Sequence, residues 1–130
     1  MKKLLFVLLA AGLIATTACK KDSSENAETY TINYSIKSIG ATIDTIGYKD
    51  ASGNIQYMLN QTNFEMTVTQ PSNNCHAWLY ASGGLSDFGW CDGELEILNE
   101  SGNIVHYKEG KTDGPATSFR WSASYDNTAN

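Results

Sequence analysis

Basic residues are scarce in this chain. Nine lysines and arginines stand against fourteen aspartates and glutamates, which gives a formal net charge of −5. Apart from Lys20 and Lys21, no basic cluster follows the N-terminal segment. A domain that binds nucleic acid needs a basic surface to neutralise phosphates. The composition therefore argues against nucleic acid as a partner.

Motifs of the common enzyme and metal-site classes are also missing. Histidine occurs only at positions 76 and 106, without a close cysteine pair, so no zinc site is expected. No glycine-rich segment has the strand–loop–helix setting of a phosphate loop. Ser82, Ser86 and Asp87 with His76 contain the residue types of a hydrolase triad, but no nucleophile-elbow sequence accompanies them. The sequence therefore predicts a protein that is not an enzyme and needs no cofactor or metal.

One group of carboxylates leaves an alternative open. Glu94 and Glu96 share one face of a predicted strand, and Glu100 follows closely. Several carboxylate oxygens are the ligands that calcium prefers. A solvated strand face that discourages edge-to-edge association is the simpler interpretation, and it is the one we favour.

The N-terminal segment is the clearest motif. Residues 1–18 join Lys2 and Lys3 to an apolar stretch and a small-residue end, in the order of an export signal. The apolar stretch is shorter than the roughly 20 residues of a spanning helix. With Cys19 directly after it, the segment resembles bacterial lipoprotein signals, which implies cleavage before Cys19 and lipid on that residue. Ordinary secretion with a free Cys19 is the alternative.

The predicted anchor also gives a location. Residues 19–28 are mostly polar after the cysteine and are expected to form a flexible tether, and the folded domain is expected over residues 29–126. We expect a protein of the cell envelope that lipid holds to a membrane, at the periplasmic or surface face of the outer membrane.

The two remaining cysteines form an even pair once Cys19 carries lipid. A hairpin about residues 81–84 would place Cys75 opposite Cys91. A disulfide there is predicted, and it would stabilise the fold by about 3 kcal/mol in the chain-entropy model. Two reduced, buried thiols are the alternative.

Alternation of apolar and polar residues dominates the domain, and no sustained helical period follows the signal. β-branched and aromatic residues at every second position fit a half-buried pleated surface. The sequence therefore predicts strands, each with one apolar face. The apolar faces are Tyr30, Ile32, Tyr34 and Ile36; Ile55, Tyr57 and Leu59; Phe64, Met66 and Val68; and Thr117, Phe119, Trp121, Ala123 and Tyr125.

Two segments have the chemistry of hairpin turns. Asp50–Gly53 and Asn99–Gly102 each start with an Asx residue that can cap the turn and end with a glycine that tolerates positive φ. Short strands between such turns indicate a single antiparallel, immunoglobulin-like β-sandwich of about seven strands. The predicted hairpins join residues 41–49 to 54–60 and residues 94–98 to 103–108.

Five short segments of the domain follow one another in an order that is similar to that of a known family. They are Tyr34, the Tyr48–Gly53 turn, Trp78–Ala81, the Glu94–Ile97 strand and the Gly102–Val105 return. From Tyr30 to about Tyr125 this order resembles the MmpS-type domain, a small exported immunoglobulin-like sandwich that assists lipid exporters in mycobacteria. The resemblance implies a transport accessory whose partner is a transporter or another envelope protein.

The segment between the two cysteines is rich in aromatic residues. Trp78 is expected in the core beside the disulfide, because tryptophan often packs there in immunoglobulin-like sandwiches. Phe88, Trp90 and Tyr80 are the candidate ligand-binding residues, as aromatic rings beside a pinned loop can stack on sugars or dock a protein. The sequence thus predicts a partner-binding lipoprotein, with a glycan-binding protein or an inhibitor of envelope-attacking hydrolases as alternatives.

Overall fold

The computed structural model describes residues 27–128, and it contains antiparallel β-strands throughout. The predicted signal segment and Cys19 lie outside the described residues. Within the described range, no helix has the length and apolar character to cross a membrane. The six strands are β1 (Thr29–Lys49), β2 (Ile55–Gln61), β3 (Phe64–Pro71), β4 (Asn74–Leu98), β5 (Ile104–Asp113) and β6 (Ala116–Thr128).

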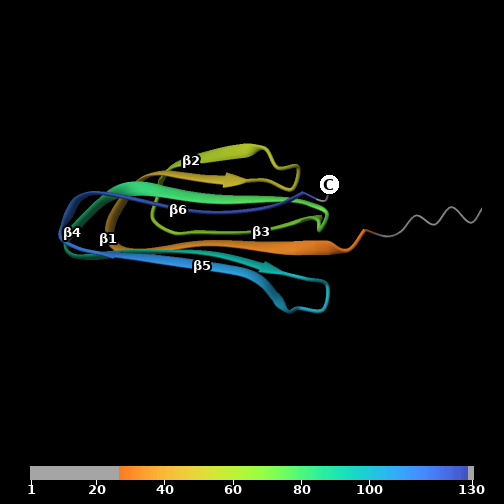
Figure 1. Cartoon of the computed structure of the whole chain (residues 1–130). Helices are drawn as coiled ribbons and strands as arrows, with labels where there is room; N and C mark the ends of the chain where they lie inside the picture. The colour runs from red at the N-terminus through yellow and green to blue at the C-terminus, as the bar shows by residue number, and fades with distance from the viewer. Residues whose placement is uncertain (1–26, 129–130) are drawn as a thin grey trace, which may run out of the picture.

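Two long strands, β1 and β4, organise the sheet. They pair with each other along most of their length, and each takes two short partners in succession. The first half of β1 pairs with β3 and its second half with β2. The first half of β4 pairs with β6 and its second half with β5. The continuous sheet thus forms two layers that fold back on each other, a β3–β5 layer (β3-β1-β4-β5) and a β2–β6 layer (β2-β1-β4-β6) (Figure 1).

The fold-back occurs where β1 and β4 cross from one layer to the other, and we call this region the bend. Ile39 pairs with Trp90 but Ala41 pairs with Leu85, so residues 86–89 of β4 lie opposite Gly40 alone. Gly40 has a φ of 61°, which favours glycine. A Cβ atom on Gly89 would lie 2.4 Å from the Gly40 carbonyl oxygen. Both glycines are therefore needed to bring the two strands through the bend.

The core lies between the two layers. The predicted inner face of β1 is confirmed, because Ile32, Tyr34 and Ile36 are fully or almost fully buried. Trp121 of β6 crosses the interior, and its indole occupies the space that side chains on Gly93 and Gly110 of the other layer would need. The all-β sandwich expected from the alternation is the observed architecture.

Both predicted hairpins are confirmed. Residues 43–49 pair with 55–61, and residues 94–98 pair with 104–109. In the first turn, the backbone amide of Gly53 donates to the Asp50 carbonyl oxygen at 2.9 Å, and Gly53 has a φ of 79°. The Gln56 amide and the backbone amides of Asn54 and Ser52 donate to the Asp50 carboxylate and hold its pKa below its usual range.

One local prediction was wrong. Residues 81–84 do not turn, because β4 continues from Asn74 to Leu98 as one strand. The structure accordingly has six strands where about seven were expected. Gly83 explains part of the difference between the predicted turn and the observed strand. It is buried, and a Cβ atom there would lie 2.0 Å from the Thr42 carbonyl oxygen, so this glycine permits close strand packing rather than a turn.

Candidate functional site

The outer face of the β2–β6 layer carries a cluster of aromatic side chains. Along the first half of β4 burial alternates strictly: Cys75, Ala77, Leu79 and Ala81 point into the core. Trp78 and Tyr80 therefore lie on the outer face, where they are partly exposed. Tyr57 of β2 joins them from across β1 and is 62% exposed. We call Tyr57, Trp78 and Tyr80 the aromatic surface.

The three rings have a defined mutual geometry. Trp78 and Tyr80 stack with ring centroids 5.7 Å apart and an interplanar angle of 10°. Tyr57 stands edge-on to Trp78 at 6.4 Å and 83°. With Thr45 they line a shallow cleft of about 360 Å³. The arrangement offers a broad apolar plane with one upright wall.

Gly47 forms the floor under this cluster. A Cβ atom at this position would lie 2.6 Å from an atom of the Trp78 six-membered ring and 3.1 Å from the Tyr57 ring. The absence of a side chain on β1 thus lets the indole lie over the strand. Rings packed over a strand glycine protect its backbone and fix the ring orientation.

The apolar character extends along β2. Ile55 and Leu59 are 50% and 62% exposed, so the alternating set Ile55, Tyr57 and Leu59 faces solvent. Its neighbour Met58 packs against the core instead. The prediction of one apolar face was correct, but that face is the outer one. An exposed apolar cluster of this kind is typical of an interaction surface.

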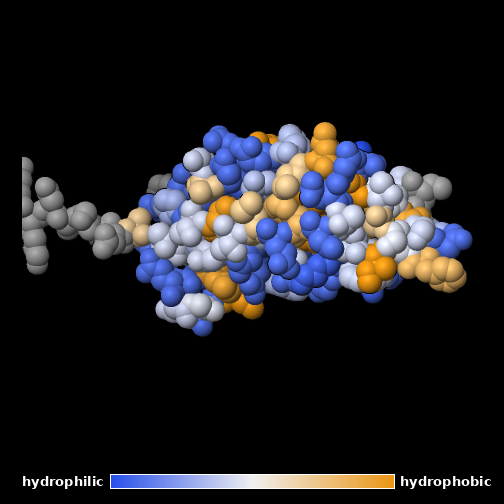
Figure 2. All heavy atoms as spheres, turned by 180° about the vertical axis from the view of Figure 1, so that it is seen from behind, coloured by the Kyte–Doolittle hydropathy of each residue, from blue (hydrophilic) through white to orange (hydrophobic). Residues whose placement is uncertain are grey.

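The structure separates the residues that the sequence placed in one aromatic loop. Tyr80 belongs to the aromatic surface, whereas Trp90 lies beyond the bend on the other layer, with the Lys111 Nζ 5.9 Å from its ring centroid. Phe88 lies in the bend and is 94% exposed. Figure 2 shows hydrophobic residues at the surface of this end, which is remote from the start of β1. The predicted core position of Trp78 was wrong, since its neighbours Ala77 and Leu79 fill the core.

The predicted disulfide is not present, because Cys75 and Cys91 are both free and buried. Cys75 pairs with Asn127 near the start of β4, whereas Cys91 pairs with Ser38 just after the bend. They therefore lie toward opposite ends of the sandwich, and a disulfide needs Cα atoms within about 7 Å. Burial raises the pKa of each thiol to about 11, which keeps the reactive thiolate scarce at neutral pH.

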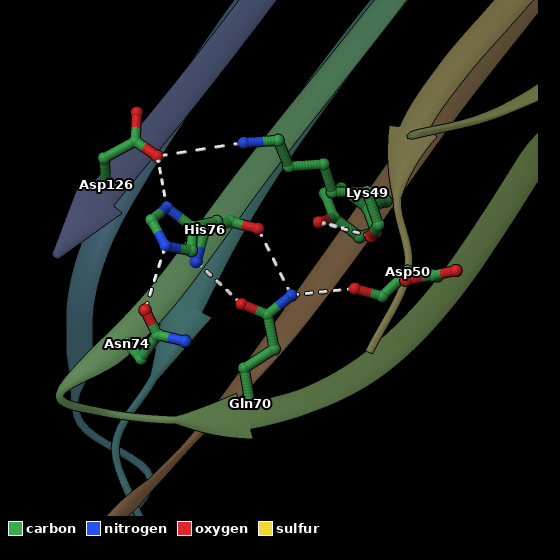
Figure 3. Close-up of polar contacts among 7 residues, drawn as sticks. Lys49, Asp50, Gln70, Asn74, His76 and Asp126 are labelled. Atoms are coloured by element: carbon green, nitrogen blue, oxygen red, sulfur yellow. Dashed lines mark hydrogen bonds and ion pairs between the residues drawn. The ribbon is translucent and has the colours of Figure 1, made fainter. Parts of the chain in front are cut away.

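A polar cluster closes the end of the sandwich opposite the bend (Figure 3). The Gln70 side chain is 2% exposed; it donates to the carbonyl oxygens of Asp50 and His76 and accepts from the His76 amide. These bonds join β3, the first hairpin and β4. The role of the Gln70 side chain is therefore structural, because both of its polar atoms have partners within the cluster.

The His76 imidazole belongs to the same cluster, and among residues 27–128 neither of its ring nitrogens bonds to a serine or cysteine. Its Nδ1 lies 2.8 Å from the Asp126 carboxylate and its Nε2 lies 3.1 Å from the Asn74 side-chain oxygen. Asp126 also lies 3.8 Å from the Lys49 Nζ. Ser82 and Ser86 lie farther along β4 toward the bend. The geometry thus brings none of the triad candidates to His76.

The outer face of the β3–β5 layer is acidic. Asp92, Glu94 and Glu96 alternate with buried residues of β4, and Glu109 of β5 pairs directly with Glu94. Glu96 accepts a hydrogen bond from the Asn33 side chain at 3.0 Å. Among residues 27–128, no group of three or more His, Cys, Asp or Glu side chains could hold a metal ion.

Comparison with known proteins adds no relative, since no protein-family model and no curated protein matches the chain.

Proposed function

We propose that this chain is a non-enzymatic glycan-binding lipoprotein of the cell envelope, held to a membrane by lipid on Cys19, and that sugar rings stack on the aromatic surface. The single observation that carries the proposal is the parallel Trp78–Tyr80 pair on an exposed strand face, with Tyr57 edge-on beside it. The transport-accessory and inhibitor roles stay predictions, because no contact among the described residues favours either.

The rings make no contribution to the core that would explain their position. The inner face of the same layer already buries Ile43, Ile46 and Leu79. Two tyrosines and a tryptophan bury large areas when a ligand covers them, and their polar tips can still bond to it. A sugar ring matches both features, because its C–H face can cover the aromatic rings and the hydroxyls at its rim can bond to their polar tips. No hydrogen bond of the Tyr57 or Tyr80 hydroxyl occurs among residues 27–128, so both remain free for a ligand.

The flat, pre-formed geometry also limits the cost of binding. Trp78 is held over Gly47 and stacked on Tyr80, so little rotamer freedom remains to be lost. The cleft is open and shallow, which suits a chain polymer that lies across the sheet rather than a small molecule enclosed in a cavity. We therefore assign the surface to a polysaccharide.

The test is a tryptophan-fluorescence and calorimetric titration of the full chain in detergent, preceded by a glycan array to select the polysaccharide. Replacing Trp78 by alanine is expected to weaken binding about tenfold or more, the equivalent of 1.4 kcal/mol, because stacking and apolar contact are lost together. Trp90→Ala is the matched control, since Trp90 lies on the other layer.

Two results would overturn the proposal. The first is a wild-type chain that binds no polysaccharide on the array. The second is a Trp90→Ala variant that loses binding while Trp78→Ala keeps it. The anchor has its own readout, because the intact mass of membrane-extracted protein shows whether Cys19 carries acyl chains.

A further inference from the structure

A second, polar cleft adjoins the aromatic surface on the same outer face. It has a volume of about 430 Å³ and is lined by Asp44, Ser82, Gly83, Ser118, Phe119 and Arg120. Ser82 lies two residues after Tyr80 on the outward side of β4, and it pairs in register with both Thr45 and Arg120. Because Thr45 lines the aromatic cleft, the two clefts meet at the Thr45–Ser82 pair.

The local backbone explains how Asp44 reaches this cleft. The pairing of β1 with β4 shifts register between Ile43 and Thr45, so Asp44 has no β4 partner. Asp44 is exposed, and Arg120 on β6 is exposed as well. A register shift at such a position re-aims a side chain from the regular face of the sheet. The charged groups thus stand at the end of the aromatic surface that lies nearer the bend.

The two charged groups are uncommitted within the part of the chain that the structure describes. Arg120 is the only arginine of the chain, and within residues 27–128 neither Arg120 nor Asp44 forms an ion pair. A guanidinium only donates hydrogen bonds and a carboxylate only accepts them, whereas a serine hydroxyl does both. Together they match the mixed donor and acceptor pattern of neighbouring hydroxyl groups on a sugar ring.

We propose that the aromatic surface and this polar cleft form one extended site for a neutral oligosaccharide longer than a single ring. One sugar unit stacks on Trp78 and Tyr80, and a following unit is bound through its hydroxyls by Asp44, Ser82 and Arg120. One positive and one negative group leave the cleft without net charge, and the chain's net charge of −5 repels polyanions. This inference rests on the proposed function and adds the ligand's length, direction and charge.

The test is a titration of the full chain with methyl β-glucoside, cellobiose and cellohexaose, which are neutral probes of increasing length. Affinity is expected to rise with length, because only the longer probes reach the polar cleft. Arg120→Gln and Asp44→Asn are each expected to weaken cellohexaose binding about tenfold, since hydrogen bonds to charged groups are the stronger ones, and to leave the binding of the one-ring methyl β-glucoside unchanged. Lys37→Gln is the matched control on the other layer, where Lys37 pairs with Asp92 of β4.

The outcomes separate this inference from the proposed function. If Trp78→Ala weakens every probe but Arg120→Gln and Asp44→Asn weaken none, the glycan-binding function stands and the extended site is wrong. The extended site is also wrong if all three probes bind equally well, or if an oligogalacturonide binds more tightly than cellohexaose. If no oligosaccharide or polysaccharide binds, both proposals fall.

Discussion

The two layers of the sandwich share their central strands but differ in what they present to solvent. On the β2–β6 layer the outward positions of β4 hold Trp78 and Tyr80, whereas on the β3–β5 layer they hold Asp92, Glu94 and Glu96. The inward positions are similar on both, with small and branched apolar residues. The acidic layer also carries Trp90 and Tyr107 on its outer face, but among the described residues neither of them stacks on another ring. A cluster of rings in mutual contact is therefore a property of the β2–β6 layer and not of the architecture as a whole.

The strands at the sheet edges repeat this contrast. β2 carries no charged residue and no proline, whereas β3 contains Glu65 and Pro71 and β5 contains lysines, a glutamate and an aspartate. Charges and proline on an edge strand discourage pairing with other chains. The β2 edge thus lacks this protection beside the aromatic surface, whereas β6 at the other edge of the same layer carries Arg120 and Asp126.

The largest predicted effect comes from filling the space under an indole in the interior. A Cβ atom on Gly110 would lie 1.5 Å from the Trp121 Nε1, so Gly110→Ala must displace the indole from between the layers. We expect a loss of about 3 kcal/mol in the free energy of unfolding, measured by urea denaturation, because overpacked cores cost this much.

Gly47→Ala is the matched control, because Trp78 covers Gly47 on the outer face, where a displaced ring meets solvent rather than the opposite layer. We expect Gly47→Ala to change the free energy of unfolding by less than about 1 kcal/mol. An equal loss for both variants would mean that the aromatic surface is as much a part of the core as Trp121.

A smaller effect is expected from the buried thiols, one in each layer. Burial raises the pKa of Cys75 and Cys91 from 9.0 to about 11, so the unfolded chain releases these protons first. Their contribution to stability is complete below about pH 9 and is lost as the pH rises toward 11. Between pH 8 and pH 10 we expect a loss of about 1 kcal/mol for each thiol, measured by denaturation.

The control for this prediction is the Cys75→Ala/Cys91→Ala variant, whose stability should fall less steeply over the same pH range. Thiol labelling gives a second measurement, since both cysteines should react only after unfolding. An intact mass two hydrogens below that of the reduced protein would contradict the free-thiol state.

The smallest predicted effect concerns the acidic face itself. Glu94 and Glu109 are directly paired across β4 and β5, and like charges in such pairs are destabilising. Glu94→Gln is therefore expected to raise the free energy of unfolding by about 0.5 kcal/mol at low salt. The gain should disappear at high salt, where the repulsion is screened.

Glu65→Gln is the comparison variant, because Glu65 lies 3.7 Å from the Lys37 Nζ and should gain nothing. If Glu94→Gln destabilises the protein instead, Glu94 takes part in a favourable interaction that outweighs its repulsion from Glu109, and the prediction is wrong.

Local patterns in the sequence were sufficient to predict most of the fold. Alternation gave the strands and the inner face of β1, and the Asp50–Gly53 and Asn99–Gly102 turns gave both hairpins. These local patterns could not predict that β4 continues through Gly83 as one strand. Glycine fits a turn and a close strand contact equally well, and only the distant Thr42 carbonyl decides between them.

The candidate site was only partly predictable, for a related reason. Alternation shows that a strand has two faces but does not show which of them meets the core. Tyr80 was identified from its aromatic character, whereas Trp78 was assigned to the core and Tyr57 to a buried face. Trp121 fills the interior space against Gly93 and Gly110 of the opposite layer. Which tryptophan lies inside therefore depends on how the two layers pack, and no single segment of the sequence shows it.

The place at which β1 begins has a mechanical consequence. Thr29 follows directly on the predicted tether and opens a central strand, with β3 on one side and β4 on the other. A pull on this end acts along the strand, so the hydrogen bonds to both neighbours bear the load together rather than breaking one after another. Because β1 carries Gly47 and β4 carries Trp78 and Tyr80, tension from a polymer bound as proposed would reach the predicted tether through a strand that is paired on both sides.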